Sequence, residues 1–494
     1  MTDKDRLEEQ RRSLALALRR AELTVEELWL RQFSLGGDSG LIEIDAYLHG
    51  IGELDPLQRD VLAQTVNERL DEVTWAHRAS YSRPVRDSRP LGRPHAALVG
   101  LLEGAELAPP DRLPAVAEAA CRLIGVEVTI YLADYDQRLL HRVNGASTSN
   151  GDRRQETLQI DTTLAGRAFR EVRALPSTTA GRPLLWVPLL DGAERLGVLE
   201  VRPADPADLE DPGLRTQCRW LSMLLGHLVT LLDQYGDAFD LVRLPKPRTT
   251  GGELIWSLLP PLTAGVDNFV VTGVVEPRQE VNGDAFDYAL SEHTATLVII
   301  DAAGHDVRSG LVTATALAAH RRARHAGHGL YEQARAMDEA IGELFDGRSS
   351  DGRLSATAVL AELDLAGGRL RYLNAGHPPP LVMRAGKVVK PLTGGLRPPL
   401  GLGAHALTIA EEALQPDDWL VLHTDGITEA RDRTGVPFGD ARLADCLQRE
   451  AAAGYPPPET ARRLIRAILE HQDGELQDDA TVLLARWSSP RHPT

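Results

Sequence analysis

The sequence has few cysteines and no pairing pattern among them. Three are present in 494 residues, Cys121, Cys218 and Cys446, and they stand far apart without a CxxC motif. This scarcity excludes a disulfide-stapled fold, and the spacing offers no set of cysteine ligands for a metal. The pattern is typical of ordinary thiols in a reducing compartment.

The sequence also lacks long apolar runs. The longest candidate membrane span, residues 220–232, is too short to cross a bilayer and contains His227. Residues 1–12 mix charges of both signs and show no apolar core followed by a small-residue cleavage site, so they do not predict a signal peptide. We therefore expect a cytoplasmic protein with no membrane partner.

Basic residues are in the minority, since 71 Asp and Glu stand against 54 Lys and Arg, for a formal net charge of −17. Broad binding to nucleic acid requires a basic stripe, and the one local basic run, 320–328, is short. We therefore expect no nucleic-acid partner. A hydrophobic content of 43% with 25% charged residues is typical of a folded protein, and the length predicts roughly three domains.

The first half of the chain changes from a helical pattern to a mixed pattern of helix and strands. Apolar residues at helical spacing predict an N-terminal helical region over 1–85, with a helix starting at Asp55-Pro56. Residues 81–94 have the composition of a linker. Region 108–233 predicts an α/β module in which a helix precedes short strands, and its expected strands are 126–133, 184–190 and 196–201, with a turn at Asp191-Gly192.

A long helix is predicted at the end of this module. Its apolar stripe runs from Leu221 to Tyr235 at helical spacing. The stripe fits either packing on its own domain or pairing with a second copy in a homodimer. The helix opens a helical connector over 214–262, which overlaps the last domain, 250–488.

The last domain predicts a layered α/β fold with a largely antiparallel sheet. The strand-like segments there are 268–275, 295–300, 356–364, 369–373 and 419–424. The helix-like segments are 309–324, 330–345 and 458–471.

Aspartates recur in this domain where an apolar strand meets a sharp loop. Asp284 lies in VNGDAFDY, Asp301 ends TLVIID, Asp425 ends WLVLHTD, and Asp478-Asp479 precede ATVLLARW. A carboxylate at such a place is costly unless it is solvated, hydrogen-bonded or bound to a cation. One such residue is typical of a solvated turn, but the repetition favours a shared cation site.

Oxygen ligands without a His or Cys cluster favour Mg²⁺ or Mn²⁺ over Zn²⁺. Two such ions can bridge a water, lower its pKa and hold it for in-line attack on phosphorus. The pattern therefore predicts phosphoester hydrolysis.

Six ordered blocks carry a resemblance to a known family. They are SLLPP at 257–261, GDAFD at 283–287, DAAGHD at 301–306, NAGHPPP at 374–380, HTDGITEARD at 423–432 and DDATVLLAR at 478–486. Together they resemble the metal-dependent protein phosphatase 2C superfamily, in its bacterial branch of stage II sporulation protein E and RsbU. The resemblance covers about residues 250–488.

The resemblance implies an α-β-β-α sandwich that holds two Mn²⁺ or Mg²⁺ ions and hydrolyses phosphoserine or phosphothreonine. It implies that Asp284 bridges the metals and that Asp301, with the backbone carbonyl of Ala302, completes the first site. Asp425 and Asp478 would hold the second, and the choice between Asp478 and Asp479 as direct ligand stays open. Asp287 and Glu429 are interpreted as structural or outer residues, and SLLPP as part of a helix that packs on the domain.

Two positions depart from the family pattern. Asn282-Gly283 replaces a double glycine, and Ala302 replaces a glycine, but neither change removes a ligand. His305, His377 and His423 are candidate acids or bases, although a histidine beside glycine in a loop is more often structural. Arg278 is a candidate phosphate-binding cation, with a surface arginine as the alternative.

The middle region resembles a GAF sensory domain, through VEVTIYLADYDQRLL, TLAGRAFRE and LLWVPLLDGAERLGVLEV. The alternative is a packing or dimerisation module without a ligand, and the sequence names no ligand for it. The overall hypothesis is a sensor-regulated serine/threonine protein phosphatase. By family analogy its substrate is a phosphorylated anti-sigma factor antagonist, in control of sigma factors.

Two rival functions remain open. One is a catalytically silent scaffold that keeps the phosphatase fold and binds a signalling partner. The other is a phosphoesterase for a nucleotide or another small phosphate, for which a deep closed pocket would be expected.

Overall fold

The computed structural model describes residues 3–21, 23–35, 37–73, 92–144, 156–179, 181–244, 248–276, 283–304, 307–344, 354–403, 408–474 and 476–488. It divides into two compact units, Met1–Arg89 and Pro90–Thr494. Most of the predicted linker 81–94 lies outside the described residues.

The first unit is helical, as its apolar spacing predicts. Its elements are α1 (Asp3–Arg20), α2 (Val25–Gln32), the short 3₁₀ helix η1 (Phe33–Leu35), α3 (Leu41–Leu48) and α4 (Pro56–Val73). Leu14, Leu28, Ile44 and Leu62 bring these helices together in one apolar core. The predicted helix start at Asp55-Pro56 is confirmed, because the Asp55 carboxylate accepts a hydrogen bond from the Leu57 amide at 2.9 Å.

The second unit begins with a module that we call the middle module, residues 92–244. Its elements are α5 (Arg93–Ala105), η2 (Pro110–Arg112), α6 (Leu113–Leu123), β1 (Val126–Ala133), β2 (Leu139–Arg142), β3 (Thr157–Gln159), α7 (Leu164–Glu171), β4 (Leu175–Thr179), β5 (Arg182–Asp191), β6 (Glu194–Pro203), η3 (Pro206–Glu210), α8 (Pro212–Asp233) and α9 (Asp240–Arg243).

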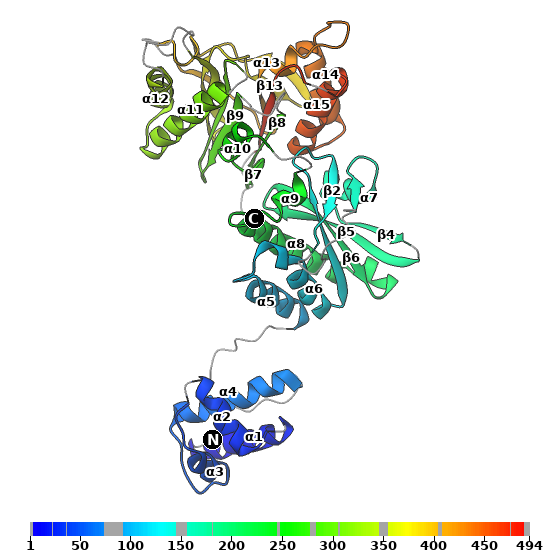
Figure 1. The fold of residues 1–494 in the computed structure, drawn as a ribbon, viewed down its shortest axis with the longest axis vertical. Helices are drawn as coiled ribbons and strands as arrows, with labels where there is room; N and C mark the ends of the chain where they lie inside the picture. Colours follow the sequence, from blue (N-terminus) through cyan, green and yellow to red (C-terminus); the bar gives the residue numbers. More distant parts are fainter. Residues whose placement is uncertain are drawn as a thin grey trace. The chain divides into compact units, whose positions relative to one another are not determined.

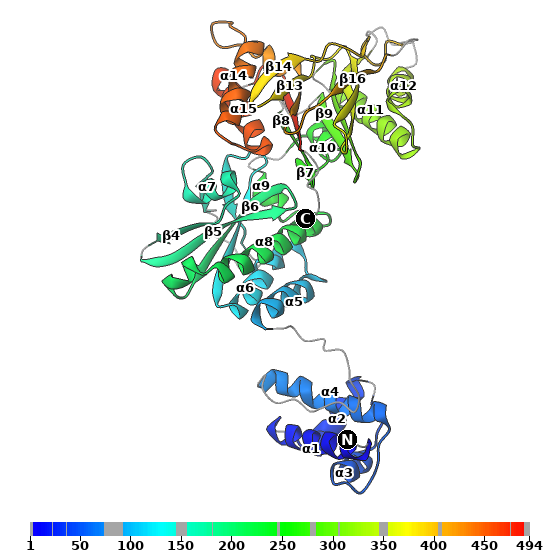
Figure 2. The same cartoon turned by 180° about the vertical axis from the view of Figure 1, so that it is seen from behind.

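These strands form one antiparallel sheet in the order β3-β2-β1-β6-β5-β4. The predicted strands 126–133, 184–190 and 196–201 are confirmed, and the turn at Asp191-Gly192 joins β5 to β6. Helices α5, α6 and α8 cover one face of the sheet, while α7 covers the other (Figure 2). Because α5 contributes Leu101 to the same core, the module extends beyond the predicted start at 108.

Helix α8 packs along the sheet through most of its apolar stripe. Leu221, Leu225, Leu228 and Leu232 are buried in the core of the middle module, whereas Leu231 and Tyr235 are exposed. Packing on its own domain is therefore observed for the greater part of the stripe.

The connector is not one continuous helix. After α8 and α9 comes α10 (Thr250–Trp256), which ends before SLLPP. Thr249 caps its start, since the Thr249 hydroxyl accepts a hydrogen bond from the Gly252 amide. The interpretation of SLLPP as part of a helix is wrong, since only Ser257 caps α10 and Pro260-Pro261 continue as an irregular chain. Two consecutive prolines cannot donate the amide hydrogen bonds that a helix needs.

The C-terminal domain, residues 248–488, contains two six-stranded sheets. One has the order β15-β12-β11-β10-β9, with β16 also paired to β12, and the other has the order β14-β13-β17-β18-β8-β7. The elements are α10, β7 (Thr263–Val266), β8 (Phe269–Glu276), β9 (Asp284–Leu290), β10 (Thr294–Ala302), α11 (Val307–His325), α12 (Leu330–Glu343), β11 (Ala356–Asp364), β12 (Arg369–Ala375), β13 (Leu381–Arg384), β14 (Lys387–Pro391), β15 (Leu396–Arg397), β16 (Ala410–Ala413), β17 (Trp419–His423), α13 (Asp425–Thr428), α14 (Gly439–Ala452), α15 (Pro457–His471) and β18 (Ala480–Trp487).

The two sheets pack face to face around Phe286, Val271 and Leu483. A second apolar cluster joins the β10-β11 sheet to α11 and α12, and a third joins the β17-β18 sheet to α14 and α15 (Figure 1). The domain is thus a four-layer α-β-β-α sandwich, as predicted, with antiparallel pairing everywhere among its described strands except between β12 and β15.

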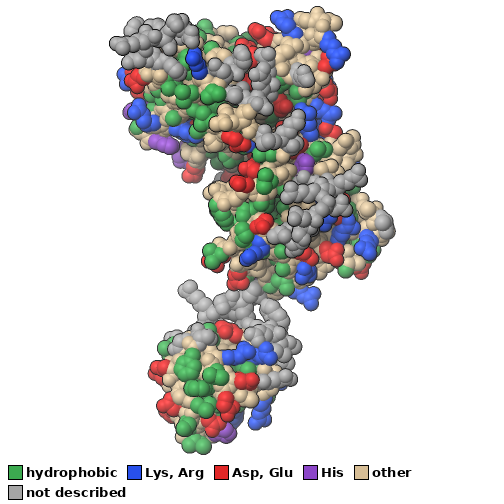
Figure 3. Space-filling model, in the orientation of Figure 1, with side chains coloured by type: hydrophobic (Ala, Val, Ile, Leu, Met, Phe, Trp, Pro, Cys, Tyr) green, Lys and Arg blue, Asp and Glu red, His purple; other side chains and the backbone are tan. Residues whose placement is uncertain are grey.

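No helix among the described residues is long and apolar enough to cross a membrane. Acidic and basic side chains are interspersed over the described part of the face in Figure 3. The pairing is often local, as in Arg122 with Glu118 and Arg335 with Glu339.

The closest helix-to-sheet approach in the middle module gives a stability test. A Cβ added at Gly226 of α8 would lie 1.9 Å from the Leu190 carbonyl oxygen of β5, whereas one at Gly100 of α5 would meet nothing within 4 Å. We expect Gly226→Ala to lower the free energy of unfolding by about 1–3 kcal/mol, because α8 must move off the sheet. Gly100→Ala should raise it by roughly 0.5–1 kcal/mol through helix propensity.

Urea unfolding followed by circular dichroism measures both changes. Equal effects of the two substitutions would contradict the close packing of α8.

Candidate metal centre

Strand ends from both sheets deliver the predicted aspartates to one place. Asp284 is the first residue of β9 and lies opposite Asp301 of β10 in the antiparallel register. Asp425 follows β17 and begins α13, and Asp478 and Asp479 directly precede β18. The structure therefore brings all five aspartates to the same end of the sandwich.

Short hydrogen bonds hold the two sheets together here. The Thr424 hydroxyl donates to Oδ2 of Asp284 at 2.8 Å, and the Thr481 amide donates to the same hydroxyl at 3.0 Å. The Gly283 amide donates to Oδ2 of Asp479 at 3.0 Å. Each sheet thus supplies a donor to a carboxylate carried by the other sheet.

Glycines allow the backbones to come this close. A Cβ at Gly426 would lie 1.9 Å from the Asp479 carbonyl oxygen, and a Cβ at Gly283 would lie 2.7 Å from that of Ala302. The motifs HTDG and NGD therefore need glycine because of the neighbouring strand.

Burial and mutual repulsion raise the pKa values of these carboxyl groups. The pKa of Asp284, which is 2% exposed, lies well above its usual value because of burial and then of Asp301 and Asp479. Burial, together with the charges of Asp425, Asp478 and Asp479, raises the pKa of Asp301 to about 7. The pKa of Asp425 is raised by burial and by Asp478 and Glu429.

Such a group of carboxylates has the chemistry of a site for a hard divalent cation. A cation relieves the repulsion that raises these pKa values, and carboxylate oxygens are the ligands that Mg²⁺ and Mn²⁺ prefer. Within the described ranges, no three His, Cys, Asp or Glu side chains are arranged closely enough to hold a metal ion. The residues thus fit a metal by their chemistry and location, and their side chains do not form a closed cage.

Comparison with known proteins identifies the domain. Residues 291–488 match the family model described as Stage II sporulation protein E (SpoIIE). The C-terminal domain is a SpoIIE-family domain. This confirms the resemblance that the six motif blocks predict.

Two curated proteins are similar to part of this chain. Phosphoserine phosphatase RsbP of Bacillus subtilis is 28% identical over 209 residues, which are 42% of this chain and 49% of the relative. Protein IcfG of Synechocystis is 29% identical over 136 residues, 27% of this chain and 21% of the relative. The matched segment thus spans half or less of the length of each relative.

A solved structure is also similar to this domain. The SiaA-PP2C domain of Pseudomonas aeruginosa is 26% identical, with a TM-score of 0.39, and the alignment covers 44% of this chain and 86% of that one.

Asp287 of the SpoIIE-family domain has cationic partners instead of carboxylate neighbours. Arg321 donates to both of its oxygens, at 3.1 and 2.8 Å, and Arg324 donates at 3.0 Å. These bonds attach α11 to β9, so the structure places Asp287 in a structural ion-pair cluster. Glu429 is exposed and acts on Asp425 through its charge.

The histidines of the motifs are buried and hydrogen-bonded. His377 Nδ1 lies 2.7 Å from the Thr357 hydroxyl, and Asn374 binds the His377 backbone at both its amide and its carbonyl. Burial, and then the charge of His423, lowers the pKa of His377 to about 3. Burial also lowers the pKa of His423. The two rings are therefore neutral near pH 7, while His305 and Arg278 lie outside the described residues.

Sequence reasoning missed Thr424 as the donor to Asp284. The sequence feature that could have indicated it is the position of Thr424 in HTDG, directly between a buried strand and the candidate ligand Asp425. The partner lies 140 positions away, so spacing alone does not reveal the contact.

The structural role of Asp287 leads to a second test. We expect Asp287→Ala to lower the free energy of unfolding by about 3 kcal/mol, because it leaves two partly buried arginines without their anion. Glu339→Ala on α12 is the matched control, since its pair with Arg335 is exposed and should contribute roughly 1 kcal/mol or less. Chemical denaturation measures both, and equal losses would contradict the structural role.

Proposed function

We propose that the chain is a Mn²⁺- or Mg²⁺-dependent serine/threonine protein phosphatase. The observation that carries this proposal is the meeting of five aspartates from two sheets in a SpoIIE-family domain. The raised pKa values of Asp284, Asp301 and Asp425 support a cationic ligand at this place.

Each aspartate has a proposed role. Asp284 would contribute to both metals, Asp301 and the carbonyl of Ala302 would complete the first site, and Asp425 and Asp478 would hold the second. Asp479 is a positioning residue, because it is buried and one of its oxygens already accepts from the Gly283 amide. Asp478 is exposed, which leaves it open to a ligand.

The bound metals would supply an activated water for attack on a phosphoester. The chain's own residues orient the carboxylates around that reaction. Thr424 fixes one oxygen of Asp284, and the close approach at Gly426 fixes the Asp425 turn against Asp479. The ligands at the rim, Asp425 and Asp478, are partly or fully exposed, which favours a phosphoprotein over a small enclosed phosphate.

The substrate is proposed by likeness to the relatives. One of them is named a phosphoserine phosphatase, RsbP. We infer a phosphorylated anti-sigma factor antagonist as the substrate, and hence a role in sigma-factor regulation.

The middle module is proposed to be a GAF-like sensor for a small-molecule or protein signal. Its six-stranded antiparallel sheet, with α6 and α8 on one face and α7 on the other, supports this assignment. Exposed Leu231 near the end of α8 and exposed Tyr235 just after the helix also leave room for a homodimer. The connector over 214–262 would link the sensor to the phosphatase.

Phosphate release from a phosphoserine peptide tests the function. With Mn²⁺ we expect turnover that EDTA abolishes and added Mn²⁺ restores. Losing a residue that only supports a metal ligand costs roughly 10- to 100-fold in activity. Asp425 is proposed as a direct ligand, so Asp425→Asn should lower the turnover by more than that. Asp417→Asn is the matched control, because Asp417 is an exposed partner of Arg486.

A folded wild-type protein with no turnover at any Mn²⁺ concentration would contradict the enzyme and favour the silent scaffold. Equal losses in the two variants would contradict the role of Asp425.

A further inference from the structure

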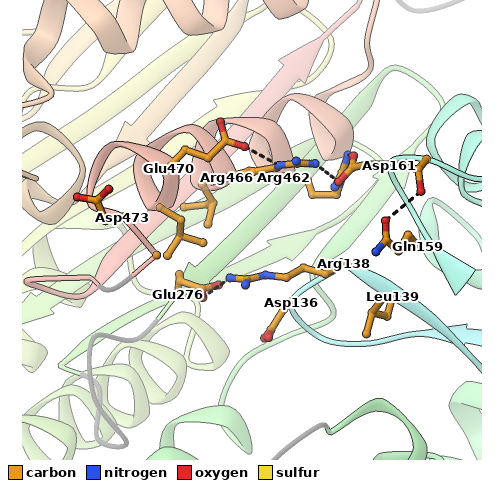
Figure 4. A pocket seen from close by; sticks show the side chains of 14 residues that line it. Asp136, Arg138, Leu139, Gln159, Asp161, Glu276, Arg462, Arg466, Glu470 and Asp473 are labelled. Carbon is orange, nitrogen blue, oxygen red and sulfur yellow. Dashed lines mark hydrogen bonds and ion pairs between the residues drawn. The ribbon is translucent and has the colours of Figure 1, made fainter. Parts of the chain in front are cut away.

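One face of α15 lies against the middle module. Arg462, Ile465, Arg466 and Leu469 recur at helical spacing along it and line a cavity of about 480 Å³. The opposite wall comes from Arg138, Gln159 and Asp161 of the middle module (Figure 4). Polar contacts beside this cavity join α15 to the middle module.

The most buried of these contacts is an ion pair. Arg195 of β6 donates to Glu459 at 3.2 Å, and their side chains are 4% and 0% exposed. Arg462 donates to both oxygens of Glu459, at 2.9 and 2.8 Å, and Arg463 adds a further bond. Burial raises the pKa of Glu459, but the neighbouring Arg462 and Arg195 outweigh it, and the net pKa lies below the usual value.

A second contact crosses the seam from Asp161. Arg462 donates to one of its oxygens at 2.8 Å, and Arg466 donates to the other. Gln137 also accepts from Arg462 and Arg195. We call the set Arg195, Glu459, Arg462 and Asp161 the interlock.

Both partners from the middle module contact α7 or lie in the turn that leads into it. The Arg195 guanidinium lies 4.6 Å from the ring centre of Phe169 on α7. Asp161 lies in the turn before α7, and a Cβ at Gly166 of α7 would come within 2.0 Å of the Ile160 carbonyl oxygen. A displacement of α7 would therefore move both contacts together.

On the other side, α15 leads directly to the candidate metal ligands. The helix ends at His471, only a short loop before Asp478, and β18 follows. At the seam, Glu276 of β8 lies opposite Ala480 in the register and 3.6 Å from Arg138 of the middle module. Motion of α15 would thus reach the loop that carries Asp478 and Asp479.

From these contacts we propose that the interlock is the contact through which the middle module controls the order of α15 and of the Asp478–Asp479 loop. This rests on the proposed function for its effect on catalysis, but the physical coupling does not. When α7 moves, the buried charge of Glu459 loses its cross-seam partner, and α15 loosens at its first turn. The metal-bearing loop then has to be ordered when the metal binds, which weakens metal binding.

Hydrogen exchange on the metal-free full chain tests the coupling without any activity. Arg195→Met keeps an apolar side chain over Phe169 and removes the pair. Asp161→Asn is the milder second variant, because Asp161 is partly exposed. In both we expect peptides within 457–484 to exchange about three-fold faster or more, with peptides of β1 and β5 unchanged.

The control is Arg122→Gln, which removes an exposed pair on α6 of the same module and should change nothing in 457–484. Circular dichroism verifies that each variant folds. Wild-type exchange in 457–484 in both folded variants would overturn the proposal, and so would a uniform rise over the whole second unit.

Metal binding supplies the second measurement. Calorimetric titration with Mn²⁺ should show a dissociation constant about three- to ten-fold higher in Arg195→Met than in the wild type. Arg195→Met combined with Glu459→Gln should raise the dissociation constant by less than the product of the two single increases, since both changes remove the Arg195–Glu459 contact. Full additivity would overturn the coupling. If the variants show the exchange effect but the wild type releases no phosphate, only the proposed function is contradicted.

Discussion

Placing several carboxylates out of water at the meeting of two sheets costs free energy, and much of the C-terminal domain is arranged around that cost. Asp284 is buried and accepts a hydrogen bond from the Thr424 hydroxyl, while Asp301 and Asp479 repel it. The glycines at 283 and 426 bring the strand ends close enough for this crowding. A fold that places carboxylates so that they repel one another is suited to binding a cation.

Asp287 shows the alternative solution within the same motif. It lies three positions after Asp284 on β9, is equally buried, and is neutralised by Arg321 and Arg324. The difference follows from strand geometry and the helix packed on that face, since neighbouring elements decide which charge each carboxylate meets. The two acids in GDAFD thus have different surroundings: Asp284 lies among other carboxylates, and Asp287 is paired with arginines that attach α11.

The sequence predicts local features well and distant partners poorly. Strands 126–133 and 356–364 agree with the structure because their apolar and β-branched residues report burial directly. The aspartates could be found because each follows a strand or a glycine. The end of α10 before SLLPP was missed, since the apolar Leu258 and Leu259 continue a helical pattern that the prolines stop. Thr424, Arg321 and Glu459 could not be assigned, because their partners lie far away in the sequence.

The middle module and the C-terminal domain are joined in two ways, by the covalent connector and by the non-covalent contacts of α15. The non-covalent contacts are better suited to transmit a small displacement. The connector breaks into α8, α9 and α10, so it cannot transmit a displacement as one rigid rod. A buried ion pair has the opposite property, because it is stable only when both partners are in place and becomes costly when either withdraws. Arg195 and Glu459 therefore respond to small shifts of α7, and α15 carries that response along its length to the aspartates.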